Sequence, residues 1–162
     1  MITTGEFHVA SASSCTPLSL LLPRRHLDEP LLIGNSPSGK SACLVLSGHR
    51  QFSWFESEGA DGWIGLAYPS VRIEMDETSV FSPDYTQVAL GNLIRKGTCL
   101  AVCAKSHEFR GQNFVIVEDN LPSTGEISVG FTRWQVVLGH GPEKNVLFKI
   151  GPSADADLPK AP

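Results

Sequence analysis

The chain lacks an excess of positive charge, a dense set of cysteines and long hydrophobic runs, and each absence excludes a class of protein. Only 19% of its 162 residues are charged, and the net charge of −4 creates no basic field for nucleic acid. No apolar run approaches the roughly 20 residues that a membrane-spanning helix needs. The opening MITTGEFHV lacks the basic flank and apolar core of a secretory signal. We therefore expect a soluble, cytoplasmic protein that binds neither nucleic acid nor membrane.

The four cysteines are too few and too scattered for a disulfide framework. Cys43, Cys99 and Cys103 lie inside apolar runs, where a free thiol behaves as a small buried hydrophobe, and Cys15 lies in a polar segment. Cys99 and Cys103 stand four residues apart on one predicted strand face, too far to share a metal unaided. We expect core thiols, a reducing compartment and no metal site.

The length and composition are those of one globular domain. Hydrophobic residues make up 41% of the chain, and a domain of this size buries well over half of its unfolded surface. Residues 1–150 are predicted to form a single β-rich domain. Residues 151–162 are rich in proline, alanine and aspartate and are predicted to form a flexible C-terminal tail.

The centre of the predicted sheet is the stretch Ser41–Asp76. It contains three apolar runs close together, which are Cys43–Leu46, Phe52–Phe55 and Trp63–Met75. Within the last run, alternate residues from position 71 to 75 are apolar and their neighbours are charged, which is the period of a half-buried strand. The stretch predicts a meander of three antiparallel strands.

Residues 47–73, SGHRQFSWFESEGADGWIGLAYPSVRI, resemble part of the pleckstrin-like domain of chloride-current regulator proteins. In that family a strand ending near Ser-Trp precedes a glycine turn and a Tyr-Pro-x-Ile strand. The resemblance covers about thirty residues, and the rest of the chain departs from the family pattern.

Strand patterns continue on both sides of the centre. The run Thr98–Ala104 is apolar on both faces and is typical of a central strand. In Glu126–Leu138 the apolar phase changes, which predicts a bulge near Arg133. Further strands are expected within residues 3–13, 18–22, 31–33, 114–117 and 145–150. The fold class is mainly β, with α+β possible: an antiparallel sandwich or partly open barrel of about 8–10 strands with one covering helix.

The covering helix is predicted over Ser82–Lys96. Ser82 is a good N-cap, Pro83 suits the first helical position, and Gly97 can end the helix in a left-handed conformation. Gly91 in the middle weakens such a helix by roughly 1 kcal/mol.

One short motif, residues 34–41 (GNSPSGKS), fits the phosphate-binding pattern G-x-x-x-x-G-K-[ST]. In a genuine site Gly34 and Gly39 let backbone N–H groups approach the phosphates, Lys40 neutralises charge, and Ser41 holds the magnesium of Mg-ATP. These four residues are phosphate-binding candidates only if the motif is genuine.

The sequence around the motif favours a hairpin loop. A phosphate-binding loop needs a helix that begins at Lys40, but the residues after it alternate like strands, and crossover helices are missing. We expect no cofactor, and Mg-ATP is the alternative. The first turn after Lys40 separates the two interpretations, because a strand there makes the match accidental.

The function that we expect is a small binding or interaction module whose ligand is a small molecule or a protein. The aromatics Trp54, Trp63, Tyr68 and Trp134 are the ligand-binding candidates, since tryptophan and tyrosine are enriched in pockets and interfaces. Sheet edges must be covered or paired, and the aromatics exceed what a small core needs, which predicts a symmetric homodimer.

An enzyme is the alternative interpretation, and the sequence favours it less. It would be either a phosphotransferase using Lys40 and Ser41 or a small hydrolase built from loop carboxylates and histidines. No G-x-S-x-G elbow occurs, so catalytic residues stay unassigned. The hydrolase candidates are His8, His26, His49, His107, His140, Glu56, Glu58, Asp61, Glu118 and Asp119.

Overall fold

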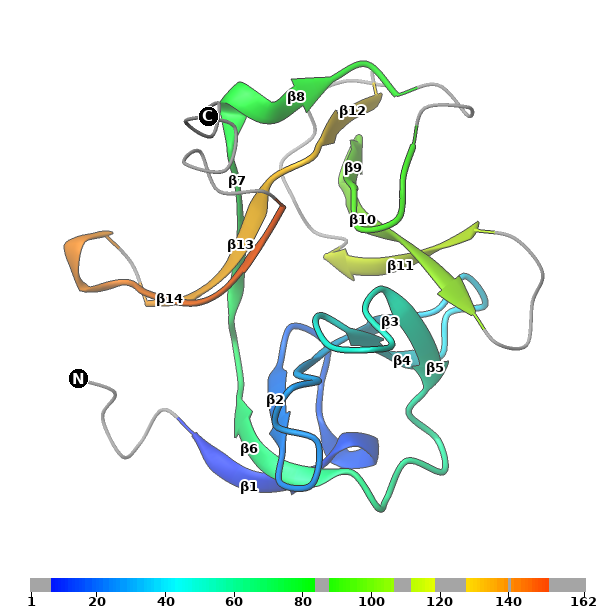
Figure 1. Cartoon of the computed structure of the whole chain (residues 1–162), viewed down its shortest axis with the longest axis vertical. Coiled ribbons are helices and arrows are strands. Elements are labelled where there is room, and N and C mark those ends of the chain that lie inside the picture. The colour runs from blue at the N-terminus through cyan, green and yellow to red at the C-terminus, as the bar shows by residue number, and fades with distance from the viewer. Residues whose placement is uncertain (1–6, 84–87, 107–111, 119–127, 140, 152–162) are drawn as a thin grey trace, which may run out of the picture.

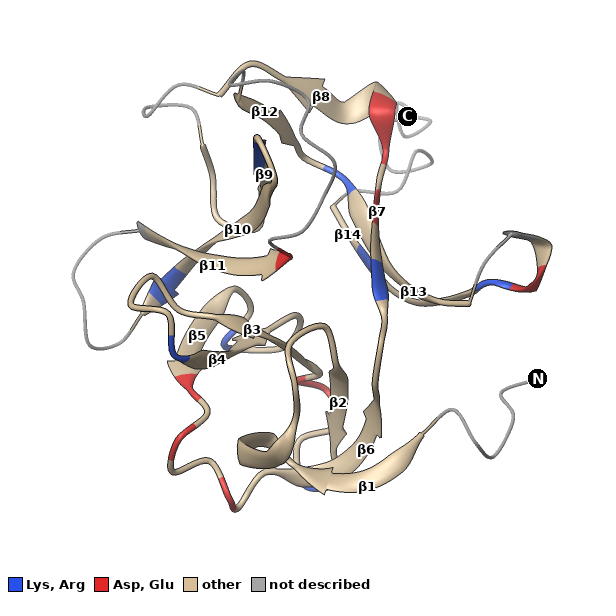
Figure 2. Ribbon diagram, turned by 180° about the vertical axis from the view of Figure 1, so that it is seen from behind, with Lys and Arg blue, Asp and Glu red and all other residues tan. Residues whose placement is uncertain are grey.

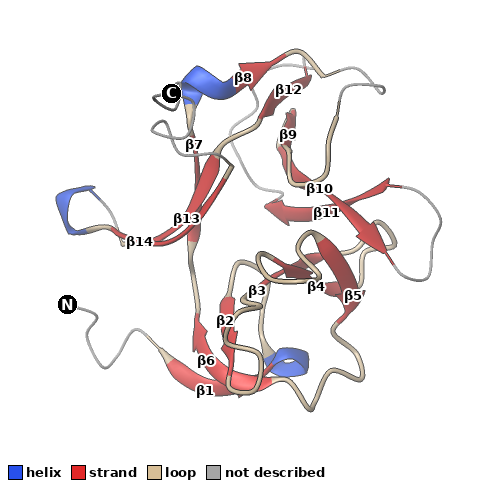
Figure 3. Cartoon of the chain, viewed as in Figure 1, coloured by secondary structure: helices blue, strands red, loops and turns tan. Residues whose placement is uncertain are grey.

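The computed structural model describes residues 7–83, 88–106, 112–118, 128–139 and 141–151. Its strands form two sheets, and the helical segments among these residues are three short 3₁₀ turns (Figures 1 and 3). The prediction of a mainly β fold of the barrel or sandwich type is confirmed. Apart from Gly151, the predicted tail lies outside the described residues. The 3₁₀ turns are η1 (Ala12–Ser14), η2 (Glu77–Ser79) and η3 (Gly141–Glu143).

The larger sheet contains eleven strands and the smaller sheet three. In Figure 1 the smaller sheet lies on the left of the molecule. The larger sheet comprises β1 (His8–Ser11), β2 (Leu20–Pro23), β3 (Leu31–Asn35), β4 (Ser41–Val45), β5 (Ser53–Glu56), β6 (Ile64–Tyr68), β8 (Val80–Phe81), β9 (Leu93–Lys96), β10 (Cys99–Ser106), β11 (Gln112–Glu118) and β12 (Ser128–Phe131). The smaller one comprises β7 (Arg72–Met75), β13 (Trp134–Leu138) and β14 (Asn145–Ile150).

Five strands of the larger sheet close into a barrel. They pair in the order β3–β4–β5–β10–β11, and β11 returns to β3 where Ile116 faces Asn35. All pairs in this ring are antiparallel except β5 with β10, which run parallel. Closure removes two free edges, which is how small β-domains avoid edge-to-edge association.

Alternate residues of β3 and β4 pack into two different clusters. Leu32 and Leu44 belong to the main core, which continues to the smaller sheet through Trp134 and Ile150. Leu31 and Cys43 face the opposite way, into a second cluster. Because both faces of these strands are covered, they consist of continuous apolar residues rather than alternating ones.

The central stretch Ser41–Asp76 is only partly the predicted meander. Its first two strands, β4 and β5, do form an antiparallel hairpin. The third run is divided instead of adding to β5: β6 lies between β1 and β2, and β7 joins β13 in the smaller sheet. The break follows Pro69, where Ser70 has a φ of 61°. The segment that resembles the pleckstrin-like domain is therefore distributed over three separate strand groups.

The predicted helix over Ser82–Lys96 is wrong in the described residues. Leu93–Lys96 forms β9, which pairs with β10 on one side and β12 on the other. Gly91 adopts a φ of 87°, which cannot continue an α-helix, and a Cβ there would lie 2.3 Å from the Phe52 ring. Gly97, with a φ of 58°, turns β9 into β10 instead of ending a helix. The hydrogen bonds that β9 forms with a strand on each side stabilise the extended conformation more than the capping residues stabilise a helix.

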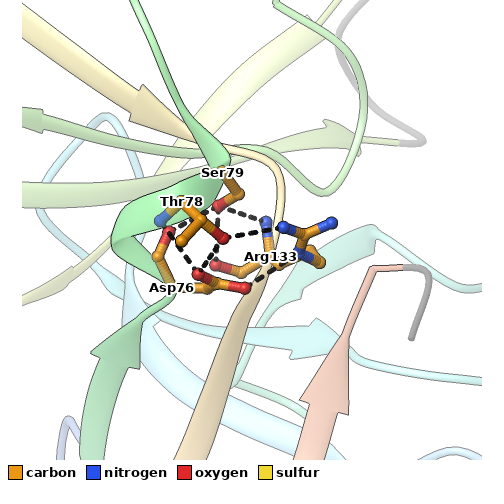
Figure 4. A network of polar contacts seen from close by, with 4 residues as sticks. All are labelled: Asp76, Thr78, Ser79 and Arg133. Atoms are coloured by element: carbon orange, nitrogen blue, oxygen red, sulfur yellow. Dashed lines mark hydrogen bonds and ion pairs between the residues drawn. The ribbon is translucent and has the colours of Figure 1, made fainter. Parts of the chain in front are cut away.

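The phase change within residues 126–138 is confirmed, but it marks a change of sheet rather than a bulge. β12 belongs to the larger sheet and β13 to the smaller, and Thr132 and Arg133 join them. Figure 4 shows how Arg133 is held: its Nε donates to Asp76 Oδ2 at 2.9 Å, and its backbone N–H donates to Ser79 Oγ at 3.1 Å. The Thr78 hydroxyl also donates a hydrogen bond to Asp76. This hydrogen bond is the largest cause of the lowered pKa of the Asp76 carboxyl.

Gly65 marks the tightest backbone approach in β6. A Cβ at this position would lie 1.9 Å from the carbonyl oxygen of Leu22 on β2. We expect Gly65→Ala to lower the free energy of unfolding by about 2–3 kcal/mol, because backbone cannot move aside as a side chain can. Urea denaturation measures the loss. Gly62→Ala is the control, since open space surrounds Gly62, and equal losses in both variants would contradict the prediction.

Candidate functional site

The phosphate-binding motif forms a β-hairpin. Gly34 lies in β3, Ser41 begins β4, and a turn joins them. The Ser36 N–H donates to the Lys40 carbonyl at 2.7 Å, and the Gly39 N–H donates to the Ser36 carbonyl at 2.9 Å. These N–H groups are thus used inside the turn. A strand rather than a helix follows Lys40, so the loop lacks the helix N-terminus on which phosphate binding depends.

Each unusual residue of the motif has a structural role in the hairpin. A Cβ at Gly34 would lie 2.6 Å from the Ile116 carbonyl oxygen, where β3 meets β11 and closes the barrel. Gly39 has a φ of 85°, which the turn requires. The Lys40 ammonium lies 3.7 Å from a carboxylate oxygen of Glu56, and Ser41 accepts hydrogen bonds from Ser57 at its carbonyl.

The four aromatic candidates do not meet in one cavity. Trp54, Tyr68 and Trp134 are 3%, 7% and 2% exposed and belong to the main core. Trp63 lies apart, where His26 stacks on it at 4.4 Å between ring centroids and Arg50 lies over its ring at 5.0 Å.

A pocket of about 570 Å³ lies on the outer face of β9, β10, β11 and β12. The strand register explains its composition, because alternate residues share one sheet face. Leu100, Val102 and Val115 point into the core, and the pocket-lining residues Cys99, Ala101, Phe114 and Ile116 are their neighbours along the strands. Asn113, which has the parity of Val115, also lines the pocket. The described lining residues are Ile94 and Lys96 from β9, Cys99 and Ala101 from β10, Asn113, Phe114 and Ile116 from β11, Ser128 from β12, and Pro37, Pro83 and Val88 from loops.

Two successive rows of side chains cross the pocket. In the first, Cys99 pairs with Lys96, and Lys96 pairs with Ser128. In the second, Ile116 pairs with Ala101, which pairs with Ile94. The first row carries an amine, a thiol and a hydroxyl, and the second is apolar. The pocket therefore has a polar end beside the β9–β10 turn.

Lys96 is the one charged residue among the described pocket-lining residues. Figure 2 shows the blue of basic residues on β9, the strand that carries Arg95 and Lys96. Within the described part of the chain, no hydrogen bond or ion pair engages its ammonium. The other charged side chain of β9, Arg95, belongs to the opposite strand parity and does not line the pocket.

Comparison with known proteins assigns the chain to a family. The model of the family described as "Uncharacterised protein y4lG" matches residues 9–158. The chain belongs to the y4lG family. A relative described as uncharacterized protein y4lG, from Sinorhizobium fredii (strain NBRC 101917 / NGR234), is 42% identical over 150 residues, which cover 92% of each protein. No solved structure matches the chain.

The y4lG family match runs from β1 to beyond β14. It therefore includes the barrel, the smaller sheet and every strand that lines the pocket. The family descriptions state no ligand, so the pocket is assigned by its geometry. None of the described helical segments is long and apolar enough to cross a membrane.

The described hydrolase candidates of this y4lG-family chain have varied surroundings. Glu56 is paired with Lys40, Asp61 accepts a hydrogen bond from Ser13, and His26 stacks on Trp63. Among the described residues, no group of three or more His, Cys, Asp or Glu side chains could hold a metal ion. His107, Asp119 and His140 lie outside the described residues.

Cys43 is expected to be the least reactive of the thiols whose pKa burial raises. It is fully buried, and burial raises the pKa of its thiol to about 12, with the nearby Cys15 as a second cause. At pH 8 only about one molecule in ten thousand carries the reactive thiolate. Iodoacetamide labelling read by mass spectrometry should modify the half-buried Cys15 before Cys43, and Cys43 only after urea is added. Equal rates in the folded protein would contradict this.

Proposed function

We propose that the protein is a binding module whose ligand is a small, largely apolar molecule held in the pocket on the outer face of β9–β12. The volume of about 570 Å³ supports this, because it falls within the range of about 300–1,000 Å³ typical of small-molecule sites. The row Ile116–Ala101–Ile94 offers an apolar floor that water solvates poorly. The pocket's apolar floor is the observation that carries the proposal.

A neutral fluorescent probe tests the binding proposal. N-phenyl-1-naphthylamine should bind the wild-type protein with increased emission, and Ala101→Phe should abolish the increase because the new ring fills the floor. Ile94→Trp is a second blocking variant in case the first does not fold, with circular dichroism as the check. Ile64→Trp adds a ring on β6, where Ile64 is 49% exposed, and should leave binding unchanged. An unaltered signal in folded blocking variants, or none in the wild type, would reject the proposal.

We also propose that this binding module forms a homodimer and is located in the cytoplasm. Two aromatics that suggest a dimer, Tyr68 and Trp134, are buried, and exposed apolar side chains occur instead at Val9, Ile64 and Leu66 of β1 and β6. Light scattering over a hundredfold range of concentration tests the dimer. A mass of 17.5 kDa throughout would reject it.

A further inference from the structure

The pocket is asymmetric along the direction of its strands. Its polar row, Cys99–Lys96–Ser128, lies next to the β9–β10 turn, and the apolar row of Ala101 comes next. Beyond it, Phe114 lines the far part of the pocket at 37% exposure. Each step of two residues advances about 7 Å along a strand, so the rows separate the charged end at Lys96 from the apolar side chains of Ala101 and Phe114. Asn113, next to Phe114, is the polar lining residue of the far part.

The charge at the polar end is uncompensated among the described residues. Lys96 has no ion pair there, whereas Lys40 and Lys144 each lie near a glutamate. An ammonium beside an apolar wall attracts an anionic group, since the wall excludes part of the water that would otherwise screen the interaction. The Ser128 hydroxyl, on the residue that pairs with Lys96, can donate to the same group.

We propose that the ligand is an amphipathic molecule with one anionic head, a carboxylate or a similar group, and an unbranched or flat apolar body. This inference rests on the proposed function and adds the chemical class of the ligand. The head lies at Lys96, and the body lies over Ala101 and Ile94 toward Phe114. Charge complementarity at one end and an apolar floor at the other set this orientation.

Octanoate and 1-octanol are the matched probes, because they share a chain and differ in the charge of the head. Both should displace N-phenyl-1-naphthylamine from the wild-type protein, and octanoate should do so at about fivefold lower concentration, as expected for a partly solvated ion pair. Lys96→Met should remove this preference and leave 1-octanol within twofold of its wild-type value. Lys96→Arg should retain the preference.

The possible failures separate the inference from the proposed function. If both probes bind equally to the wild type, or if the preference survives in Lys96→Met, the pocket binds apolar molecules without the proposed head group. If N-phenyl-1-naphthylamine binds in the pocket but neither probe displaces it, the inference about the ligand class is contradicted and the proposed function stands. If the fluorophore itself does not bind, the proposed function is contradicted, and the inference with it. Lys149→Met is the charge-matched control on β14, away from the pocket, and it should behave like the wild type; an equal loss there would show that net charge, not Lys96, sets the preference.

Discussion

Replacing Trp134 by alanine is expected to lower the free energy of unfolding by about 3–5 kcal/mol, the largest loss expected of a single buried side chain here. Trp134 is 2% exposed and begins β13, between Met75 on β7 and Ile150 on β14. Its indole N–H donates to the Gly91 carbonyl at 2.8 Å. The side chain thus connects the smaller sheet to the turn before β9, and its removal opens a cavity where the two meet.

Two further variants divide this loss into its parts. Trp134→Phe keeps most of the buried ring and removes the hydrogen bond, so a loss of about 1–3 kcal/mol is expected from the unsatisfied Gly91 carbonyl and the smaller ring. Leu90→Ala on the same turn removes a side chain that is 39% exposed and should cost less than about 1 kcal/mol. Urea denaturation followed by circular dichroism gives all three values. A loss below 1 kcal/mol for Trp134→Ala would show that Trp134 does not hold the sheets together.

Most strands could be predicted because their apolar pattern depends on local sequence. The run Thr98–Ala104 is apolar on both faces, and β10 has partners on both sides. Pairing partners were harder to predict, since they depend on contacts distant in sequence. Nothing local to Trp63–Met75 indicates that β6 pairs with β2 while β7 joins the smaller sheet. For the same reason, barrel closure by a single β11–β3 bridge carries no signal in the sequence.

The helix error has a similar physical origin. Capping signals at Ser82 and Gly97 describe local preferences worth about 1 kcal/mol each, whereas β9 gains two ladders of hydrogen bonds and buries Leu93 completely. The left-handed Gly91 was the residue that could have indicated a turn there.

The pocket could not be found from the sequence, because its lining comes from four strands and from the β3–β4 and β8–β9 loops. Ile94, Ala101 and Ile116 are ordinary strand residues until the register places them in one row. The phosphate-binding motif shows the reverse case. Its glycines are conspicuous in sequence, yet Gly34 serves the approach of two strands and Gly39 serves a turn.

Replacing Arg50 by methionine is expected to cost about 2–4 kcal/mol at neutral pH, because it leaves the carboxylate of Glu29 buried without its partner. The side chain of Glu29 is 8% exposed, and Arg50 donates a hydrogen bond to each of its carboxylate oxygens. The Nε atom of Arg50 lies 3.2 Å from Oε1, and its Nη2 donates to Oε2. The expected loss of stability is smaller than for a fully buried ion pair because the Arg50 side chain is 37% exposed. Methionine keeps an apolar stem near Trp63, so that the loss reports mainly on charge.

The pH dependence of this loss identifies its cause. The hydrogen bond from Arg50 holds the pKa of Glu29 below its ordinary value, although burial opposes the shift. A lowered pKa in the folded protein stabilises it above the unfolded pKa of about 4.3, and the contribution disappears as pH falls through the folded pKa. The difference between wild type and Arg50→Met should therefore be largest near pH 7 and shrink below about pH 4.

A surface ion pair supplies the control for this experiment. Lys144 lies 2.9 Å from Glu74, with the two side chains 39% and 27% exposed, so Lys144→Met should cost less than about 1 kcal/mol. Glu29→Gln combined with Arg50→Met removes the stranded charge and should recover part of the stability that Arg50→Met alone loses. If the loss in Arg50→Met is the same at pH 7 and pH 3.5, packing against Trp63 rather than the buried carboxylate accounts for it.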